Sequence, residues 1–411
     1  MTEADVFEWD VADPLAGARE SFSLPDDVIY LDGNSLGAMP RAAASRVQEV
    51  VEREWGHDLI RSWNDNHWFE LPYRIGDKIA GLIGADTGEV VVTDCVSINL
   101  YKLVSAALKL RPGRSKLVTE AGNFPTDLYI LEGIQSSRAQ PLEVNAVADR
   151  DQIISAIDEQ TAVVLLTDVH YKTGHLLDMA AITTRAHDVG ALVIWDLCHS
   201  AGALPVDLNA IGADFAVGCG YKYLNGGPGA PSFVFAAKRH LPDARQPLSG
   251  WWGHQSPFVF SDEFEPADGI GRMMSGTQGV IGLACAEVGV DISLRFGMTA
   301  IRDKSVRMTD LFIQLFDEHL AEYGFQLVSP RDSQHRGSQV AFTHAEGYAI
   351  MQALIARGVI GDFRAPDILR FGFAPLYLRY ADVWQAIMTL AEIMKTGSWD
   401  CDEFKVVNAV T

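Results

Sequence analysis

The residues with the clearest chemical potential are a lysine and an aspartate at two predicted strand ends. Lys222 lies within 218–229, between an apolar strand and a glycine-rich turn, and Asp196 follows the apolar run 191–195. A lysine amine can condense with an aldehyde once burial lowers its pKa and makes it neutral. A partly desolvated carboxylate needs a cationic partner, which a protonated pyridine nitrogen would supply. Together the two residues indicate an enzyme built around pyridoxal 5'-phosphate.

Other polar and aromatic side chains follow strand ends in the same way. Ser97 opens a helix after the strand 89–93, and its hydroxyl could join free backbone N–H groups in a seat for a phosphate. Phe124 precedes a proline-stiffened turn and could stack on a pyridine ring. Thr167 ends another strand, where its hydroxyl could reach the phenolic oxygen of such a ring, and His199 could face the ring.

Each of these interpretations has a structural alternative. Lys222 alone also fits a solvated loop lysine, Asp196 a helix-capping residue, and Ser97 an ordinary N-cap. Phe124 fits a core phenylalanine equally well. Tyr221, directly before Lys222, is placed either to share the phosphate or to act in proton transfer.

The elements that must position these residues alternate between short apolar strands and helices. Helical spacing of apolar residues predicts helices over 40–55, 73–83, 100–110, 150–158 and 178–189. Buried strands are predicted at 89–93, 116–119, 162–167, 192–196, 215–218 and 232–236. This alternation predicts an α/β fold with a mostly parallel sheet covered on both faces. Ligands of such sheets collect beyond the carboxyl ends of the strands, where the residues above lie.

After about residue 295 the pattern changes. A long amphipathic helix is predicted over 299–322, with a final helix at 381–396. Between them the sequence predicts strands at 325–328, 338–343 and 368–373 and a helix at 347–357. We therefore expect three parts: an N-terminal segment 1–50 that packs on the smaller unit, a large cofactor-binding domain 51–295, and a small α+β domain 296–411.

Composition excludes several classes of protein. The 411 residues carry a net charge of −21, so the average field would repel a nucleic acid backbone. Five cysteines without a CxxC pair indicate reduced thiols in a cytoplasmic protein. The acidic N-terminus does not fit a signal peptide, and apolar runs stay below the roughly 18 residues that a membrane span needs. We expect a cytoplasmic enzyme with a small-molecule substrate and neither nucleic acid nor membrane as partner.

With these residues assembled, the chain resembles the kynureninase family, within the fold-type I (class V aminotransferase) pyridoxal-phosphate enzymes. The resemblance runs from Tyr30 to about residue 395. Its motifs are at 31–37 (LDGNSLG), 124–127 (FPTD), 169–174 (VHYKTG), 196–199 (DLCH), 220–226 (GYKYLNG) and 250–254 (GWWGH). The resemblance implies a mostly parallel seven-stranded sheet between helices.

The resemblance also implies roles around the cofactor. Lys222 would bond the cofactor aldehyde, Asp196 would pair with the pyridine nitrogen, and Tyr221 is the candidate general base for hydration. The remaining cofactor contacts would come from Val96, Ser97, Phe124, Pro125, Thr126, Asp127, Thr167, His199, Trp251 and Thr277. The implied reaction is the hydrolysis of L-kynurenine, or of its 3-hydroxy form, to anthranilate (or 3-hydroxyanthranilate) and L-alanine.

Family enzymes are homodimers with active sites at the interface, where Thr277 would reach the phosphate of the partner. Gln278 departs from the Gly-Thr-Pro or Asn-Pro-Pro that relatives carry at this point. Arg370 matches the arginine that holds the substrate carboxylate in a bidentate fork. The residues expected near the rest of the substrate are Asn34, His57 and His254.

Three rival functions remain open at this point. A cysteine desulfurase, a selenocysteine lyase or another class V enzyme would share the fold, but the first two place a histidine directly before the lysine and need a mobile nucleophilic thiol. Here Tyr221 stands before the lysine, and Cys285 lies in an apolar helical stretch. A non-catalytic relative would lack part of the set Lys222, Asp196 and Arg370. A metal enzyme is disfavoured because His170 and His175 lack the HExxH spacing.

Overall fold

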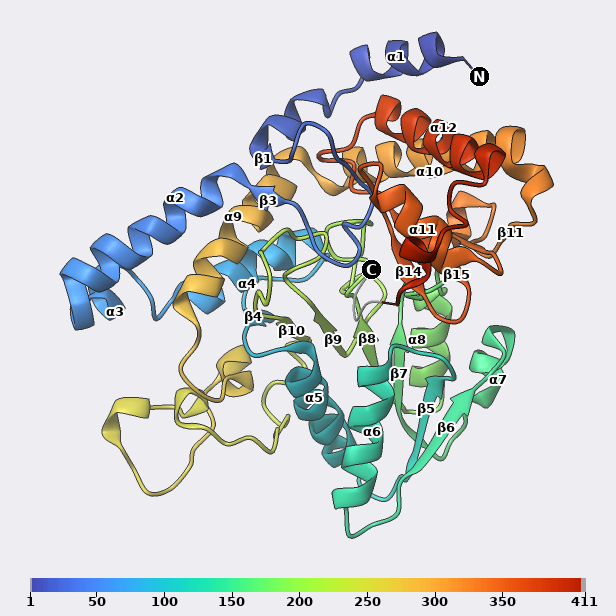
Figure 1. Cartoon of the computed structure of the whole chain (residues 1–411). Helices are drawn as coiled ribbons and strands as arrows, with labels where there is room; N and C mark the ends of the chain where they lie inside the picture. The colour runs from blue at the N-terminus through green and yellow to red at the C-terminus, as the bar shows by residue number, and fades with distance from the viewer. Residues whose placement is uncertain (1, 408–411) are drawn as a thin grey trace.

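The computed structural model describes residues 2–407 and is built on a seven-stranded sheet (Figure 1). The strand order is β4-β10-β9-β8-β7-β5-β6, and β10 runs antiparallel to both of its neighbours while the others are parallel. The strands are β4 (Val90–Val92), β5 (Lys116–Glu120), β6 (Glu143–Val147), β7 (Thr161–Thr167), β8 (Leu192–Asp196), β9 (Phe215–Gly218) and β10 (Phe233–Ala236). The predicted fold class, a mostly parallel seven-stranded α/β sheet, is confirmed.

Helices cover both faces of this sheet because its strands are apolar on both faces. Along β8, Val193 and Trp195 enter one buried cluster, while Leu192 and Ile194 enter the other. The first cluster is closed by α4 (Leu71–Leu82), α8 (Met179–Asp188) and α9 (Val280–Phe296), and the second by α5 (Val96–Leu110) and α6 (Pro125–Ser137). The predicted helix 150–158 is shorter, since α7 covers only Ile153–Ala156 after a 3-10 turn.

The C-terminal part forms a second layered unit. Its four-stranded antiparallel sheet has the order β11-β12-β15-β14. The elements are α10 (Met298–Leu320), β11 (Gln326–Leu327), β12 (Gln339–Thr343), α11 (Gly347–Ile355), β14 (Asp362–Arg364), β15 (Ile368–Gly372) and α12 (Tyr380–Thr396). All the helices and strands predicted after residue 295 are present, and two strands, β13 (Val359–Ile360) and β14, are additions.

The N-terminal segment divides its contacts between the two units. Helix α1 (Glu3–Val11) packs against α12, where the Asp10 carboxylate accepts a hydrogen bond from the backbone N–H of Tyr380 at 2.7 Å. Strand β2 (Ile29–Tyr30) pairs in parallel with β13 (Val359–Ile360). The chain then crosses to the large sheet, where the Gly37 N–H donates to Tyr221 O at 2.8 Å.

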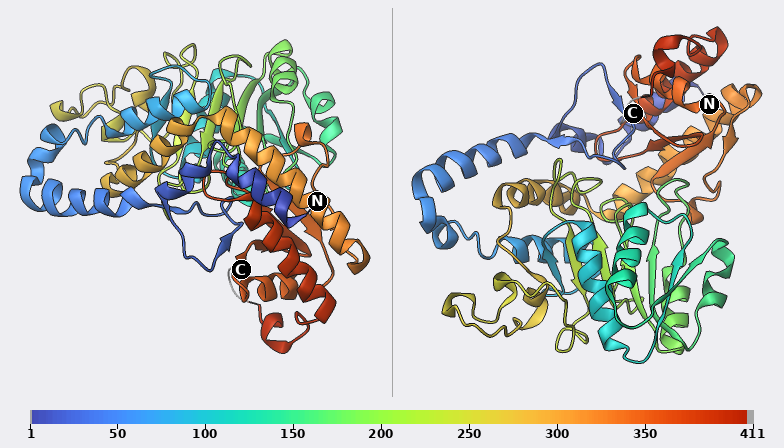
Figure 2. Two further views of the ribbon diagram at one scale, coloured as in Figure 1. Left: turned by 90° about the horizontal axis from the view of Figure 1, so that it is seen from above. Right: turned by 60° about the horizontal axis from the view of Figure 1, so that its bottom comes forward.

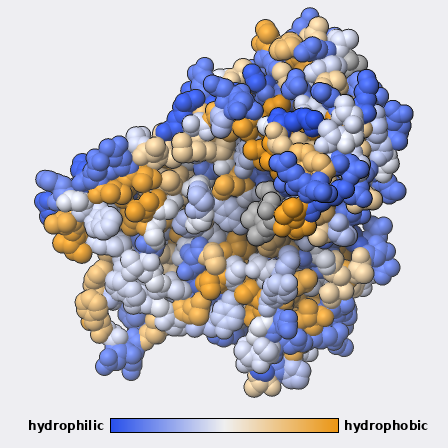
Figure 3. Space-filling view, in the orientation of Figure 1, coloured by the Kyte–Doolittle hydropathy of each residue, from blue (hydrophilic) through white to orange (hydrophobic). Residues whose placement is uncertain are grey.

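The next helical stretch forms an arm that projects from the body (Figures 1 and 2). It consists of α2 (Arg41–Glu49), a π-helical segment (Val50–Asp58), a 3-10 turn (Leu59–Arg61) and α3 (Ser62–Asp65). Helix α2 packs against α9. The arm exposes large apolar side chains: Trp55 is 60% exposed and Ile60 77%. Figure 3 shows hydrophobic surface gathered on this arm.

Candidate active site

The carboxyl ends of β4, β5, β7, β8 and β9 meet at one edge of the sheet, and a cavity of about 140 Å³ opens there. Nine of the predicted site residues line this cavity: Val96, Ser97, Phe124, Thr126, Thr167, Asp196, His199, Tyr221 and Lys222. Six further lining residues were not predicted from the sequence: Cys95, Tyr171, Cys198, Cys219, Ala230 and Ser232. The fold therefore brings together, in one cavity, predicted residues that lie up to 126 positions apart in sequence, from Val96 to Lys222.

Lys222 lies in the loop after β9 and is almost fully buried, at 8% exposure. Its Nζ is 3.4 Å from Nε2 of His199 and 5.6 Å from the ring centroid of Phe124. The N-terminal segment between β2 and α2 packs closely against this loop, because a Cβ added at Gly37 would come within 2.3 Å of the Lys222 carbonyl oxygen. Only glycine fits there, so the lysine loop is held from outside by the N-terminal segment.

Asp196 ends β8 and is 3% exposed. Its Oδ1 accepts a hydrogen bond from the Cys198 N–H at 2.7 Å. Burial raises the pKa of this carboxyl, and burial also lowers the pKa of His199 well below its usual value. A buried carboxylate with so little compensation favours a cationic partner, whereas the neighbouring imidazole stays neutral.

Asp127 lies in a small polar network behind the cavity. Its Oδ2 accepts from Nδ2 of Asn123 at 3.1 Å, and the Thr167 hydroxyl donates to Asn123 Oδ1 at 2.5 Å. Its other oxygen, Oδ1, is buried and has no hydrogen-bond partner within residues 2–407. Burial first, and then the charge of Asp196, raise the pKa of Asp127 well above the usual range. Sequence reasoning missed Asn123, which orients both predicted residues.

The start of α5 lies at the cavity and could hold an anion. The helix begins after Cys95 without a side-chain capping bond, and Cys95, Val96 and Ser97 line the cavity, so backbone N–H groups of the first turn lack a side-chain acceptor. Ser97 does not cap the helix, because its hydroxyl pairs with Oγ1 of Thr126 at 2.7 Å. The capping alternative for Ser97 is therefore wrong. Pro125 is the first residue of α6 and fixes the turn that carries Thr126.

Burial also raises the pKa of the Tyr221 phenol, and the charges of Cys219 and Cys198 add to that shift. A phenol with a pKa above its usual value near ~10 keeps its proton at neutral pH. The raised pKa argues against Tyr221 as the predicted general base and favours it as a hydrogen-bond donor. Because Tyr221 lines the cavity beside the start of α5, an anion there is the natural acceptor.

Arg370 is buried in β15 at 2% exposure, as its apolar neighbours predicted, but its fork is not open. Nε donates to Asp362 Oδ1 at 2.8 Å, and Nη2 donates to Asp362 Oδ2 and to the Ser35 hydroxyl at 2.9 Å. Nη1 donates to the carbonyl oxygen of Tyr171, a cavity residue. Asp362 lies directly opposite on β14 and occupies this bidentate fork, so the role of Arg370 in holding a substrate carboxylate stays a prediction.

Asn34 is fully buried beside the same strand. Both polar atoms of its amide lack a hydrogen-bond partner in the part of the chain that the structure describes. The amide occupies the space above Gly372, since a Cβ at that glycine would be 1.8 Å from Asn34 Oδ1. Residues 370 and 372 face the same side of β15, so Asn34 and Arg370 lie on one face. A buried amide without partners is typical of a ligand-binding position.

Eight predicted residues do not line this cavity: Asn34, Pro125, Asp127 and Arg370, described above, and Trp251, Thr277, His57 and His254. Trp251 is 42% exposed, and Thr277 lines a separate cavity of about 200 Å³. His57 is on the projecting arm and hydrogen-bonds Asp58. His254 lies in the loop before α9, where its Nε2 is 3.1 Å from the Glu263 carbonyl.

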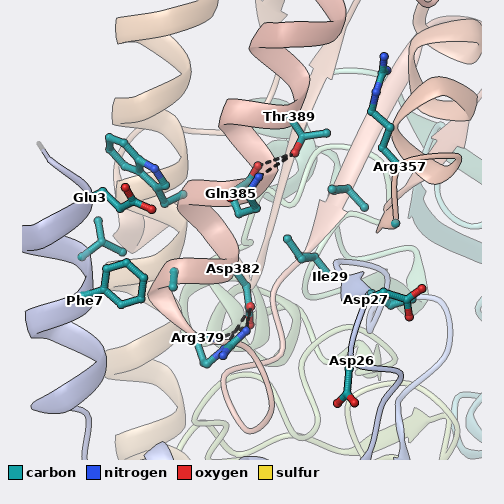
Figure 4. A pocket seen from close by; sticks show the side chains of 16 residues that line it. Glu3, Phe7, Asp26, Asp27, Ile29, Arg357, Arg379, Asp382, Gln385 and Thr389 are labelled. Atoms are coloured by element: carbon teal, nitrogen blue, oxygen red, sulfur yellow. Dashed lines mark hydrogen bonds and ion pairs between the residues drawn. The ribbon is translucent and has the colours of Figure 1, made fainter.

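A cavity of about 370 Å³ between α1 and α12 contains none of the predicted site residues (Figure 4). Between residues 2 and 407 no group of three His, Cys, Asp or Glu side chains is arranged to hold a metal ion. No helix in that range is long and apolar enough to cross a membrane.

Solved structures with the same architecture define the class. The cysteine desulfurase of Thermococcus onnurineus NA1 superposes with a TM-score of 0.78 over 93% of this chain and 98% of its own, at 19% identity. A C-DES mutant with glycine covalently linked to its PLP cofactor gives 0.78 over 91% and 99%, at 16% identity. The fold is therefore that of the fold-type I pyridoxal-phosphate enzymes, and the cavity lies at its sheet edge.

Sequence comparison then gives the particular family. Residues 301–390 match the family of the kynureninase C-terminal domain. The kynureninases of Burkholderia pseudomallei and Pseudomonas fluorescens are 51% and 50% identical to this chain, and each alignment covers 100% of this chain and 100% of the relative. The chain belongs to the kynureninase family.

Proposed function

We propose that this protein is a pyridoxal-phosphate enzyme that hydrolyses L-kynurenine to anthranilate and L-alanine. The observation that carries the proposal is about 50% identity with named kynureninases over the full chain, combined with a cavity that unites Lys222 and Asp196. The 3-hydroxy form of kynurenine is a second substrate of the same chemical class.

The residues of the cavity fit the proposed cofactor. Lys222 supplies the amine, and Asp196 supplies a buried carboxylate for the pyridine nitrogen. The phosphate would be held by the α5 N–H groups and by the hydroxyls of Ser97, Thr126 and Tyr221. When bound, the cofactor supplies an electron sink for charge that develops on the substrate.

The protein would hold and move the protons. The Lys222 amine, which lines the cavity, would be the base for the proton on the substrate Cα. Phe124 stands over the Lys222 amine and would cover one face of the ring. His199 remains neutral because burial lowers its pKa, so it adds no positive charge beside the lysine. Tyr221 keeps its proton and would donate it to the phosphate or to an oxygen of the substrate.

We further propose a homodimer whose interface completes the active site. Trp55 and Ile60 on the arm, and Phe258 (55% exposed) and Phe260 (75% exposed) near His254, leave extensive apolar surface in the single chain. Two of the predicted residues that miss the cavity lie beside these apolar side chains: His57 is in the same helical segment as Trp55, and Trp251 packs against Phe258 with ring centroids 5.7 Å apart. A second copy would cover the apolar surface and bring those residues toward a neighbouring cavity. The unpaired state of the five cysteines supports a reducing, cytoplasmic setting.

The test is turnover by the purified protein supplied with pyridoxal phosphate. We expect anthranilate fluorescence to rise on addition of L-kynurenine, with alanine formed in equal amount, and no sulfide from L-cysteine. Cys285 is a poor candidate for a desulfurase nucleophile because burial raises its pKa. Sulfide release without anthranilate would overturn the proposal in favour of the desulfurase chemistry.

A further inference from the structure

Arg370 belongs to a cluster of two arginines and two aspartates on the small-unit side of the cavity. Asp362 is 1% exposed and pairs with both Arg370 and Arg364, whose Nη2 is 2.6 Å from Asp362 Oδ2. The hydroxyl of Ser35 donates to Asp362 Oδ2 at 2.7 Å and accepts from Nη2 of each arginine. Strand β14 and the N-terminal segment therefore fix both guanidinium groups before any ligand arrives.

Asp32 is the second carboxylate of this cluster and the least compensated one. Its backbone carbonyl accepts from Ser35 N at 3.0 Å, and it forms a bridge to Gly372 at the end of β15. Its Oδ1 is buried and has no hydrogen-bond partner in the described chain. Asp362 takes the direct contacts of the arginines, so Asp32 meets their charge only at longer range.

Counting charge shows what a substrate carboxylate would meet. With both aspartates ionised, two guanidinium groups already balance two carboxylates. A substrate carboxylate beside Arg370 would be a third negative charge in a desolvated site, and like charges at close range strongly disfavour one another. One proton on Asp32 restores the balance without breaking the Arg370–Asp362 fork.

We propose that Asp32 is a positioning residue that must carry a proton for the anionic substrate to bind next to Arg370, so that its ionisation limits substrate affinity at alkaline pH. This inference rests on the proposed function, since it deepens recognition of the substrate carboxylate at the same site. Asp32 acts through Arg370 and need not touch the substrate.

The electrostatics around Asp32 support this role in the pH range where it matters. Burial first, and then the charge of Asp362, raise the pKa of Asp32 to about 7, against the opposing effects of Ser35, Arg370 and Arg364. The other titratable groups that face it are three tyrosines: Tyr30, Tyr223 and Tyr377. Burial raises the pKa of each of them, so they remain neutral across this range.

The sign of the effect follows from linkage. A bound carboxylate raises the pKa of Asp32 further, so binding above pH 7 takes up a proton, and affinity falls as pH rises. Below the pKa of the free protein Asp32 is already protonated, and affinity no longer depends on pH. Between pH 7 and pH 9 the dissociation constant should rise by up to about tenfold per pH unit.

The experiment uses the cofactor-loaded protein and the unreactive acid 4-oxo-4-phenylbutanoate, which keeps the carboxylate and ketone of the substrate but has no amine. Titration calorimetry at pH 8 in buffers of different ionisation enthalpy counts the protons taken up on binding. We expect more than half a proton per bound acid in the natural protein. The corresponding carboxamide is the matched ligand control and should take up none.

Asp32→Asn should abolish the proton uptake and flatten the pH dependence of the acid's dissociation constant. Ser35→Ala is the matched control variant, because it weakens the same cluster but keeps the titrating carboxyl, and its proton uptake should persist. Absence of proton uptake in the natural protein, or uptake unchanged in Asp32→Asn, overturns the inference. Neither result affects the proposed function, which fails separately if the loaded protein forms no anthranilate from kynurenine.

Discussion

Two buried aspartates lie at opposite ends of the adjacent strands β8 and β9, and their surroundings differ sharply. Asp214, just before β9, is 1% exposed and hydrogen-bonds His187 at 2.9 Å, His240 at 2.7 Å and Arg239 at 2.7 Å. The Val193 N–H of β8 donates to it as well, at 2.8 Å. Burial alone would raise its pKa, but the hydrogen bonds of both histidines and Val193 outweigh burial and lower it.

Asp196, at the carboxyl end of β8, is equally buried but poorly satisfied. One backbone N–H, that of Cys198, donates to its Oδ1, and burial keeps its pKa raised. The same sheet therefore satisfies one carboxylate completely and leaves the other short of partners. The difference indicates where to look for function. The carboxylate of Asp214, which stabilises the fold, has protein partners, whereas the carboxylate of Asp196, at the cavity, is left for a ligand to compensate.

The largest expected effect is on turnover, and it comes from changing Lys222 at the edge of the sheet where the cavity lies. Lys222→Ala should lower kynurenine turnover by about 10⁴-fold or more, the upper range for a positioned proton-transfer group. It should also remove the visible absorbance of the lysine-linked cofactor. The folded structure should persist, since the Lys222 amine makes only a long contact of 3.4 Å with His199. Turnover close to that of the natural protein would reject Lys222 as the cofactor lysine.

Asp196→Asn should separate activity from stability. We expect turnover to fall by about 10²–10³-fold, as when a preorganised electrostatic partner is removed. A raised pKa means that ionised Asp196 opposes folding at neutral pH, so the cofactor-free variant should melt at the same or a higher temperature. Calorimetric melting curves of the cofactor-free proteins measure this. A clear loss of stability with normal turnover would make Asp196 a structural residue.

Asp214→Asn should show the opposite behaviour. Removing the carboxylate charge weakens the hydrogen bonds from Arg239, His187 and His240, at a cost of about 1–3 kcal/mol in the free energy of unfolding. The turnover number should not change, because the cavity lies at the other end of the strands. Urea unfolding and kynurenine kinetics on the same preparation test both halves. A loss of turnover in the folded variant would show that the two ends are coupled.

The sequence predicted the parts of the molecule that depend on local apolar patterns. Strands β7, β8, β9 and β10 are buried and apolar, and the predictions placed them correctly. Strand β6 was missed because Glu143–Val147 is polar and partly exposed at the sheet edge. The π-helical winding of Val50–Asp58 was also missed, since its side-chain spacing resembles that of an α-helix.

In the site, prediction succeeded for residues that follow strand ends and failed for their distant partners. Lys222 and Asp196 could be found from the strands before them. Ser35 and Asp362 could not, because their hydrogen bond joins positions 327 residues apart. The sequence also gives no sign that Asp362 stands opposite Arg370 and occupies its bidentate fork. Cross-strand register, which depends on the whole small sheet, decides that contact.

Acid titration of the two aspartate variants gives the smallest effect, but it tests the contrast most directly. Asp214 has a lowered pKa in the folded protein, so its stabilisation is complete above the unfolded value near ~3.9 and is lost as pH falls below it. The stability deficit of Asp214→Asn should therefore shrink on acidification. Asp196 has a raised pKa, so the Asp196→Asn variant should be the more stable protein at neutral pH. This stability advantage should disappear as Asp196 takes up its proton, and it should do so at a higher pH than the change at Asp214. Urea midpoints at intervals from pH 8 to pH 2 distinguish the two, because the Asp214 gap closes only below about pH 4. If both gaps closed over the same pH range, the two carboxylates would share one environment, and burial alone, rather than the number of hydrogen-bond donors, would set their charge.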